Sequence, residues 1–328
     1  MAGGPAPARY RAIVSTVPAA GGAPVDGVPP LLHRIVDDAA LVAGGARRAM
    51  DEVVDAHLAA RAELGELLGS LVVPVSRLPE LVPVLARRRP PAPLSITLSV
   101  DTGLGGVPKA FSLTSSRAAL VTPSTVEMPA PHDVDPLWLE RVTEFVPEDV
   151  VAVVEPRRPD AGASPDWMEG LRRVLDHGCR PKLRCGGARA GAFPDVADVG
   201  RFLTLVVGAG RSFTVSMGLQ SATRHVDDAT GFVHHGWLNL LVAVARAVDG
   251  PRPGTDARTS ETVSGADAGT DPAVADALST SDSAALAREV ADLDAAAVTR
   301  VRGLFSSIGS TGPGEQGAEM VRLGLATF

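Results

Sequence analysis

The strongest constraint in this sequence is a regular alternation of short apolar runs with segments of helical periodicity. The apolar runs occupy residues 71–76, 94–100, 124–128, 150–155, 180–184, 212–217 and 303–310. Intervening segments begin with helix-start residues and carry apolar side chains three and four positions apart, as in 78–88, 135–146, 164–178 and 194–210. Strand–helix alternation of this regularity predicts a parallel sheet with helical crossovers.

Two folds fit this order of strands and helices: an open doubly wound sheet and a closed (β/α)8 barrel of the TIM type. The open dinucleotide-binding fold carries GxGxxG after its first strand, and the glycine-rich tracts 103–106 and 312–317 do not have that frame. We therefore expect an α/β fold, a TIM-like (β/α)8 barrel that is irregular in places, with extra N-terminal helices over 31–41 and 46–68. The pattern leaves the eighth strand either missing or supplied near Tyr10–Val14.

Composition changes sharply in two places along the chain. Residues 1–29 are rich in Ala, Gly and Pro, which predicts a flexible N-terminal arm. Residues 250–280 carry few apolar side chains, which predicts a disordered insertion after a long helix over 232–248. Too little chain follows this tract for a second domain, so residues 30–249 and 281–328 are expected to form a single α/β barrel domain.

Composition and charge also narrow the classes of function. With 45% hydrophobic residues the 328-residue chain can bury a sizeable core, and its net charge of −7 disfavours nucleic acid as a partner. No apolar run reaches the roughly 20 residues that span a bilayer, and the N-terminal sequence lacks the pattern of a secretory signal. We expect a cytoplasmic protein that binds a small-molecule substrate and neither nucleic acid nor membrane. The oligomeric state is not predicted.

In a barrel of this type the active site lies at the C-terminal ends of the strands, and this rule selects the candidate residues. Lys182 and Arg184 share one face of a predicted strand because side chains alternate along it. Two inward-facing cations need a partner or a cavity, and Glu155 is the first candidate partner. A lysine beside a second cation has a lowered pKa, so Lys182 is predicted to be a Schiff-base nucleophile or an anion anchor. A structural ion-pair ring is the alternative.

Three carboxylates, Asp101, Glu127 and Glu155, end three successive strands. Inward carboxylates at one rim are typical ligands of Mg²⁺ or another hard cation. Pairing with some of the many arginines explains these residues equally well. A divalent metal such as Mg²⁺ is therefore the one cofactor considered, and no cofactor is certain.

The segment FVHHGWLN and a glycine-rich turn add further candidates. His235 and Asn239 lie four residues apart and are predicted to share one helix face, with His235 as a proton-transfer candidate or, alternatively, a solvent-facing side chain. The turn 309–317 is suited to present backbone N–H groups to a phosphate or carboxylate. The predicted substrate-binding residues are Arg184, Arg77, Arg224, Gln220, Asn239, Ser216, Ser310 and Gly312.

Several short motifs together resemble a family of uncharacterised bacterial barrel-like proteins. They are HRIVDDAAL (33–41), PKLRCGG (181–187), MGLQSATRH (217–225), FVHHGWLN (232–239) and LFSSIGSTG (304–312). Members of that family carry KLRTGG, KATAGLHHPVR, HGFLN and FGSCSF at the corresponding places. The resemblance covers residues 31–248 and 295–326 and implies a shared fold without an established activity.

The chain departs from this family at several polar positions. Thr214 stands where the family has a second lysine, and Gln220 and Ser221 stand where it has paired histidines. The retained residues are Lys182, Arg184, Arg224, His235 and Asn239. Such partial retention fits a paralogue with a changed substrate or mechanism, and it also fits a relative that has lost catalysis.

Three functional hypotheses follow from these residues. The leading one is a lyase-, aldolase- or isomerase-like barrel enzyme that acts on a small anionic or carbonyl-containing metabolite around Lys182, with Glu155 as partner and base. The second is a metal-assisted barrel enzyme that uses Asp101, Glu127 and Glu155. The third is a non-catalytic barrel that binds a ligand or a partner protein, because a fold alone does not determine function.

Overall fold

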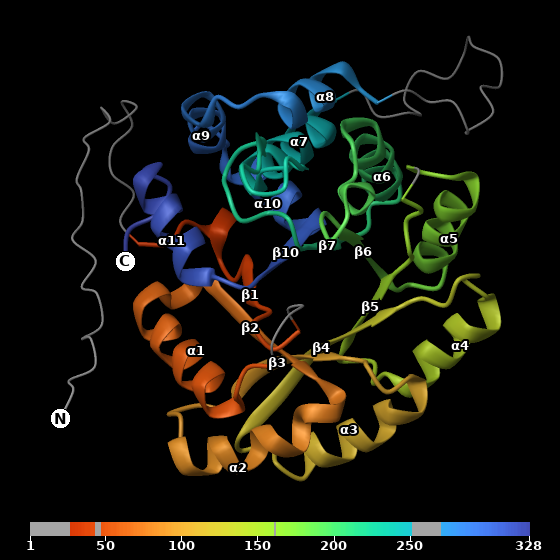
Figure 1. The fold of residues 1–328 in the computed structure, drawn as a ribbon, viewed down its shortest axis with the longest axis vertical. Helices are drawn as coiled ribbons and strands as arrows, with labels where there is room; N and C mark the ends of the chain where they lie inside the picture. The colour runs from red at the N-terminus through yellow and green to blue at the C-terminus, as the bar shows by residue number, and fades with distance from the viewer. Residues whose placement is uncertain (1–26, 43–46, 161, 251–269) are drawn as a thin grey trace.

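A closed barrel of eight parallel strands forms the centre of the molecule in the computed structural model, which describes residues 27–42, 47–160, 162–250 and 270–328 (Figure 1). The strands are β1 (Val36–Asp38), β2 (Leu68–Pro74), β3 (Leu94–Ser99), β4 (Val121–Pro129), β5 (Val151–Glu155), β6 (Arg180–Arg184), β7 (Phe213–Ser216) and β10 (Phe305–Ser310). Around the barrel their order is β1-β10-β7-β6-β5-β4-β3-β2. This arrangement confirms the predicted TIM-like (β/α)8 barrel.

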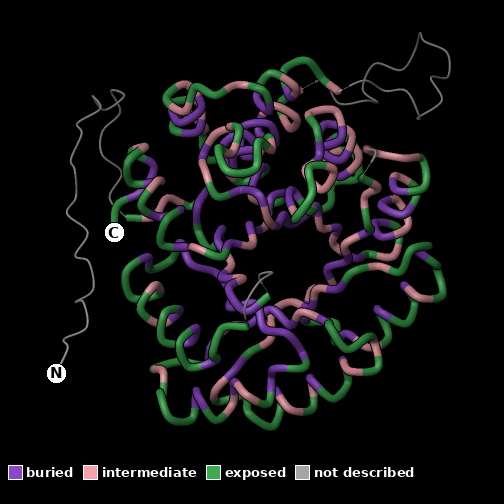
Figure 2. Tube along the Cα trace, in the orientation of Figure 1, coloured by how far each residue is buried: buried purple, intermediate pink, exposed green. Residues whose placement is uncertain are grey.

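Helices surround the barrel and provide the crossovers between its strands (Figure 1). They are α1 (Met50–Leu64), α2 (Leu78–Arg88), α3 (Val107–Ser115), α4 (Pro136–Phe145), α5 (Pro165–Asp176), α6 (Val196–Gly208), α7 (Trp237–Asp249), α8 (Pro272–Ser279), α9 (Ser283–Ala291), α10 (Ala295–Leu304) and α11 (Pro313–Arg322). The outer helices turn exposed surfaces to solvent and buried residues inward (Figure 2). None of the helices in the described ranges has both the length and the apolar character that crossing a membrane requires.

Strand β1 closes the barrel and corrects two predictions. Val36 of β1 pairs in parallel with Ile308 of β10 and with Leu68 of β2, so the eighth strand lies inside the predicted helix 31–41. The apolar residues of that segment are divided between a 3₁₀ turn (Pro30–Leu32) and the strand, which together imitate helical spacing. Residues 1–26, including the alternative strand at 10–14, lie outside the described residues.

The predicted helix over 232–248 begins later than expected. Val233–His234 form the short strand β9, which pairs antiparallel with β8 (His225–Val226), and α7 starts only at Trp237. Gly236 is the N-cap of this helix rather than an interior residue. A Cβ atom at Gly236 would collide with the carbonyl oxygen of Ala222, so the β7–α7 loop packs closely against this glycine.

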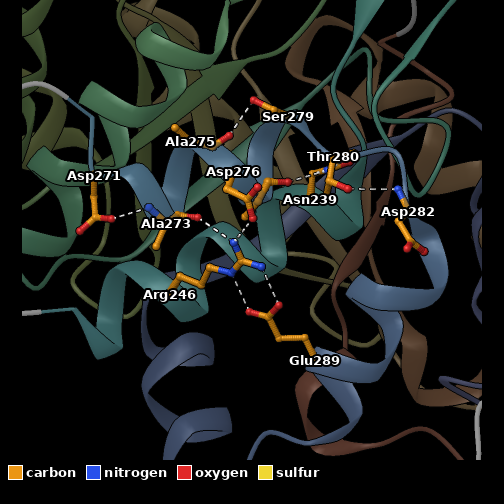
Figure 3. Close-up of polar contacts among 11 residues, drawn as sticks. Asn239, Arg246, Asp271, Ala273, Ala275, Asp276, Ser279, Thr280, Asp282 and Glu289 are labelled. Carbon is orange, nitrogen blue, oxygen red and sulfur yellow. Dashed lines mark hydrogen bonds and ion pairs between the residues drawn. The ribbon is translucent and has the colours of Figure 1, made fainter.

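Part of the predicted disordered insertion 250–280 is also corrected. Residues 251–269 lie outside the described residues, but α8 is a helix whose Val274, Ala277 and Leu278 are buried. Figure 3 shows how polar groups of α7 hold this helix: Asn239 Nδ2 donates to the carbonyl oxygens of Ala277 (2.6 Å) and Thr280 (2.8 Å). Arg246 reaches both Asp276 of α8 and Glu289 of α9 (Figure 3). The prediction of disorder is therefore wrong for the residues of α8.

Candidate functional site

The interior of the barrel is a cavity of about 640 Å³ with many polar side chains in its lining. TIM barrels usually fill this space with layers of branched apolar residues. Here the inward positions of several strands are hydroxyl-bearing or charged: Ser70, Thr97, Ser99, Thr125, Glu127, Lys182, Thr214, Ser216, Ser307 and Ser310. On β6, Leu183 points the other way and is buried in the apolar core outside the barrel. Strand alternation thus produces a hydrophilic lumen inside an apolar shell.

Four charged side chains of alternating sign form a connected set on the neighbouring strands β4, β5 and β6. Lys182 Nζ lies 2.7 Å from Glu127 Oε2 and 3.9 Å from Glu155 Oε2. Arg184 Nε lies 2.6 Å from Glu155 Oε1. The side chain of Lys182 is only 12% exposed, whereas that of Arg184 is 48% exposed at the mouth. The two cations and two carboxylates therefore compensate one another.

Glu127, rather than Glu155, is the closest partner of Lys182. Glu127 is on β4 and Lys182 is on β6, with β5 between them. In a TIM barrel each interior layer takes its side chains from alternate strands, so residues two strands apart meet across the lumen. Glu155 lines an adjacent cavity instead and holds both cations from the side. The sequence-based choice of Glu155 as first partner is corrected by this layer geometry.

The pKa of Lys182 is shifted in the direction opposite to the prediction: it is raised, not lowered. Burial lowers the pKa of this ammonium, but attraction to Glu127 and Glu155 and the hydrogen bond to Glu127 outweigh burial, so its pKa lies above the ordinary value. Repulsion from Arg184, on which the predicted lowered pKa depended, is the smallest of these effects. At neutral pH Lys182 is consequently a charged hydrogen-bond donor, not a free amine.

Two hydroxyl groups next to the charged residues are available for a ligand. Thr214 Oγ1 and Ser216 Oγ are buried, line the cavity and have no hydrogen-bond partner among the described residues. The register of β6 and β7 places Thr214 beside Lys182 and Ser216 beside Arg184. A buried hydroxyl without a partner is unfavourable, so these two groups are suited to bind polar atoms of a ligand.

The C-terminal rim of the lumen includes three further residues. Met217, a non-glycine residue at φ 61°, accepts a hydrogen bond from Arg184 Nη1 on its sulfur at 2.7 Å. Gln220 is exposed and lines the mouth, as predicted. Ser310 also lines it and accepts the backbone N–H of Gly312 at 3.1 Å, so this N–H is already used. Gly312 itself is not part of the lining.

Three predicted substrate-binding residues lie outside the lumen and support the fold. Arg77 donates to Glu80 and to the carbonyl oxygen of Arg48. The backbone N–H of Arg224 donates to Asn239 Oδ1 at 2.7 Å. Because Asn239 also binds α8, its amide ties the β7–α7 loop to a helix rather than to a ligand.

His235 is likewise placed away from the lumen. It precedes α7, is fully buried, and donates through Nε2 to the carbonyl oxygen of Pro194 at 2.9 Å. Burial lowers its pKa to about 4, so the imidazole is neutral at physiological pH. Neither the helix face predicted to be shared with Asn239 nor a proton-transfer role at the cavity is supported by this position.

The three carboxylates predicted to bind a metal do not form a common site. Asp101 is exposed and accepts hydrogen bonds from the backbone and hydroxyl of Ser76. Glu127 and Glu155 are engaged by Lys182 and Arg184. Within the described ranges, no group of three or more His, Cys, Asp or Glu side chains is arranged to hold a metal ion. The ion-pair alternative therefore describes the two glutamates better.

The residues that line the opposite, N-terminal end of the lumen were not predicted from the sequence. These residues include Arg34, Asp37, Arg180 and Arg302. Arg180 could have been predicted to line the lumen, because it lies two residues before Lys182 on the same strand and thus on the same face. Arg34 and Asp37 were hidden by the incorrect helix prediction over 31–41.

Comparisons of the chain with protein-family models, with curated proteins and with solved structures give no match. The motif resemblance thus stays a prediction. The geometry of the lumen is what bears on function.

Proposed function

We propose that the protein is a barrel enzyme that moves a proton next to the carbonyl group of a small polar metabolite, as isomerases and lyases do. The observation that carries this proposal is the ammonium group of Lys182, held by two carboxylates and facing a lumen with two unpartnered hydroxyls. Arg184 and Ser216 are the last residues of β6 and β7, and Lys182 and Thr214 lie two residues before them, so the site opens towards the C-terminal ends of the strands, where TIM barrels carry out their chemistry.

Lys182 and Glu127 have complementary roles in this reaction. Glu127 lines the lumen and accepts the proton from the carbon next to the carbonyl on Oε1, because its Oε2 is held by Lys182. The bonding electrons move onto the carbonyl oxygen, and the Lys182 ammonium stabilises the resulting enolate by hydrogen bonding. If the carbon that loses its proton carries a hydroxyl group, return of that proton to the former carbonyl carbon, with transfer of the hydroxyl proton to the former carbonyl oxygen, gives an isomerase. In a lyase the base instead takes the proton of a hydroxyl group on the next carbon, that carbon becomes a carbonyl as the carbon–carbon bond breaks, and the enolate left on the other fragment is stabilised in the same way and then protonated.

The remaining residues of the site position the substrate and the lysine. Glu155 binds both Lys182 and Arg184 and so fixes the two cations relative to each other. Arg184 at the mouth is suited to a carboxylate of the substrate, because a guanidinium offers paired donors to such a group. Thr214 and Ser216 supply hydroxyls for substrate oxygens. A Schiff base at Lys182 is less well supported, because its raised pKa keeps the amine protonated.

The direct test is exchange of substrate protons in heavy water. A panel of small 2-keto acids, aldoses and ketoses is incubated with the protein, and NMR measures deuterium incorporation next to the carbonyl. We expect exchange with the wild type and a loss of about 100-fold or more in Lys182→Met and Glu127→Gln, the range of one acid–base group. Lys182→Arg, which keeps the charge, should retain part of the activity.

A matched control and a trapping experiment complete the test. Arg141→Met alters an exposed residue of α4 and should leave exchange unchanged. Borohydride should trap no substrate adduct on Lys182, and an adduct there would replace the enolate mechanism by a Schiff base. If the Lys182→Met protein folds and still exchanges substrate protons as fast as the wild type, the charged residues have only a structural role.

A further inference from the structure

Three arginines from separate elements line the N-terminal end of the lumen: Arg34, Arg180 and Arg302, the arginine cluster. Arg34 precedes β1, Arg180 begins β6, and Arg302 lies in the last turn of α10 before β10. Strands rise about 3.3 Å per residue, so Arg180 is about 13 Å from Arg184 along β6. The arginine cluster is therefore separated from Arg184 at the C-terminal mouth of the same lumen, with Lys182 between them at about 7 Å from Arg180 along the strand.

The hydrogen bonds of the arginine cluster go to neutral oxygen atoms. Arg34 Nη2 donates to Ser95 (3.1 Å), Arg180 Nε to Ser212 (2.9 Å), Arg180 Nη1 to Ser306 (2.9 Å), and Arg302 to the carbonyl oxygens of Phe305 (2.6 Å) and His33 (2.9 Å). In the part of the chain that the structure describes, none of the three forms an ion pair with a carboxylate. This contrasts with Lys182 and Arg184, which are both paired with carboxylates.

The charge of the arginine cluster is only partly compensated. Burial lowers the pKa of Arg180 and of Arg302, and the charge of Asp37 opposes this effect in both. Burial raises the pKa of Asp37 itself, despite its hydrogen bonds with Ser307 and Ser70. Among the described residues, Asp37 is thus the carboxyl group whose charge acts on Arg180 and Arg302, and the negative charge of Glu127 further disfavours the ionised form of Asp37. Partly buried charge of one sign is unfavourable, and a bound anion relieves it.

Backbone strain accompanies this arrangement. Arg34 has φ 51°, in the left-handed region that side chains other than glycine rarely adopt. Of the three non-glycine residues with positive φ in the described ranges, Arg34 and Met217 line the lumen, at opposite ends. Strain of this kind concentrates where the surrounding structure holds a functional group in place. It therefore marks the N-terminal end as well as the C-terminal one.

We propose that the arginine cluster binds an oxyanion of the phosphate class at the N-terminal mouth of the barrel. Guanidinium groups match phosphate oxygens with paired N–H donors, and the hydroxyls of Ser95 and Ser306 lie beside them. The reacting groups of TIM barrels come from the other end, so this second site binds without taking part in catalysis. The inference is independent of the enzymatic activity proposed for Lys182.

Calorimetric titration of the full-length protein with inorganic phosphate at low ionic strength tests the site. We expect saturable binding that also raises the melting temperature by mass action. Arg180→Met and Arg34→Met should each weaken binding about tenfold or more, the effect of losing a hydrogen bond to a charged group. Asp37→Asn, which removes the local negative charge, should strengthen binding.

The controls separate this site from the one at Lys182. Arg184→Met, at the far end of β6, and the exposed Arg141→Met should bind phosphate as the wild type does. If Arg180→Met does not fold, Arg34→Met still decides the question, because the Arg34 side chain is exposed and makes one hydrogen bond. Absence of saturable binding to the wild type, or binding that is lost in Arg184→Met and kept in Arg34→Met, would overturn the proposal.

Discussion

His235 is enclosed on all sides and keeps a neutral imidazole, with Nδ1 unpartnered among the described residues. Burial lowers its pKa from the ordinary 6.5 to about 4. Between these two pH values the unfolded chain binds a proton that the folded chain does not, so the free energy of unfolding rises with pH there. The stability due to the neutral ring is complete above pH 6.5 and is lost as the pH falls towards 4.

We therefore expect His235→Gln, which keeps an N–H donor for Pro194 and does not titrate, to flatten the pH dependence of stability. The change over this pH window should be at most about 3 kcal/mol, the equivalent of the pKa difference. Urea unfolding at several pH values measures it. His132→Gln is the control, because the His132 side chain is 95% exposed. Identical slopes for wild type and His235→Gln would show that the ring is not held neutral.

The pair formed by Lys182 and Glu127 gives a second prediction for single residues. Lys182→Met leaves Glu127 largely buried without its cation, whereas Glu155 keeps Arg184, and breaking a buried pair in this way costs about 3 kcal/mol or more. The double variant Lys182→Met/Glu127→Gln removes the stranded charge and should recover part of that loss. Denaturant unfolding compares the two proteins, and a double variant less stable than Lys182→Met would contradict compensation between these side chains.

Among the elements, the strands flanked by long helices were predictable from the sequence. The short strand β1 and the short helix α8 were not. The apolar runs of β2 to β7 stand out because each is bounded by a segment of clear helical period. β1 has only three residues, and the preceding 3₁₀ turn adds Leu31 and Leu32 at helix-like spacing. α8 was missed because its composition resembles that of the polar tract before it, although Val274, Ala277 and Leu278 form a buried face.

The packing of α8 leads to a prediction about stability. Leu278 is completely buried against the helices outside the barrel, so Leu278→Ala should lower the free energy of unfolding by about 2–5 kcal/mol. Ser279→Ala, on an exposed position of the same helix, is the control. Thermal or denaturant unfolding measures both variants. A negligible effect of Leu278→Ala would mean that α8 is dispensable, as the sequence had suggested.

For the whole molecule, the barrel followed from the alternation of strands and helices. The rule that active sites lie at the C-terminal ends of the strands led to five residues of the lumen, Glu127, Lys182, Arg184, Ser216 and Ser310. What the sequence could not give was the pairing of side chains across the lumen. That pairing depends on barrel layers, which bring Glu127 of β4 opposite Lys182 of β6. Arg77, His235 and Asn239 resembled site residues only because buried structural groups and ligand-binding groups use the same polar side chains.

The pairing of β1 with β10 has a consequence for how the chain folds. Val36 and Ile308 are neighbours in the barrel although nearly all of the described chain lies between them. Contacts of such long sequence separation form late and slow folding, because the loop must close before the contact is made. Until β10 is synthesised, the strands that precede it form an open sheet with two unpaired edges, the form in which β-proteins associate wrongly. Pairing of β10 with β1 and β7 thus closes the barrel and removes the free strand edges through which the growing chain could aggregate.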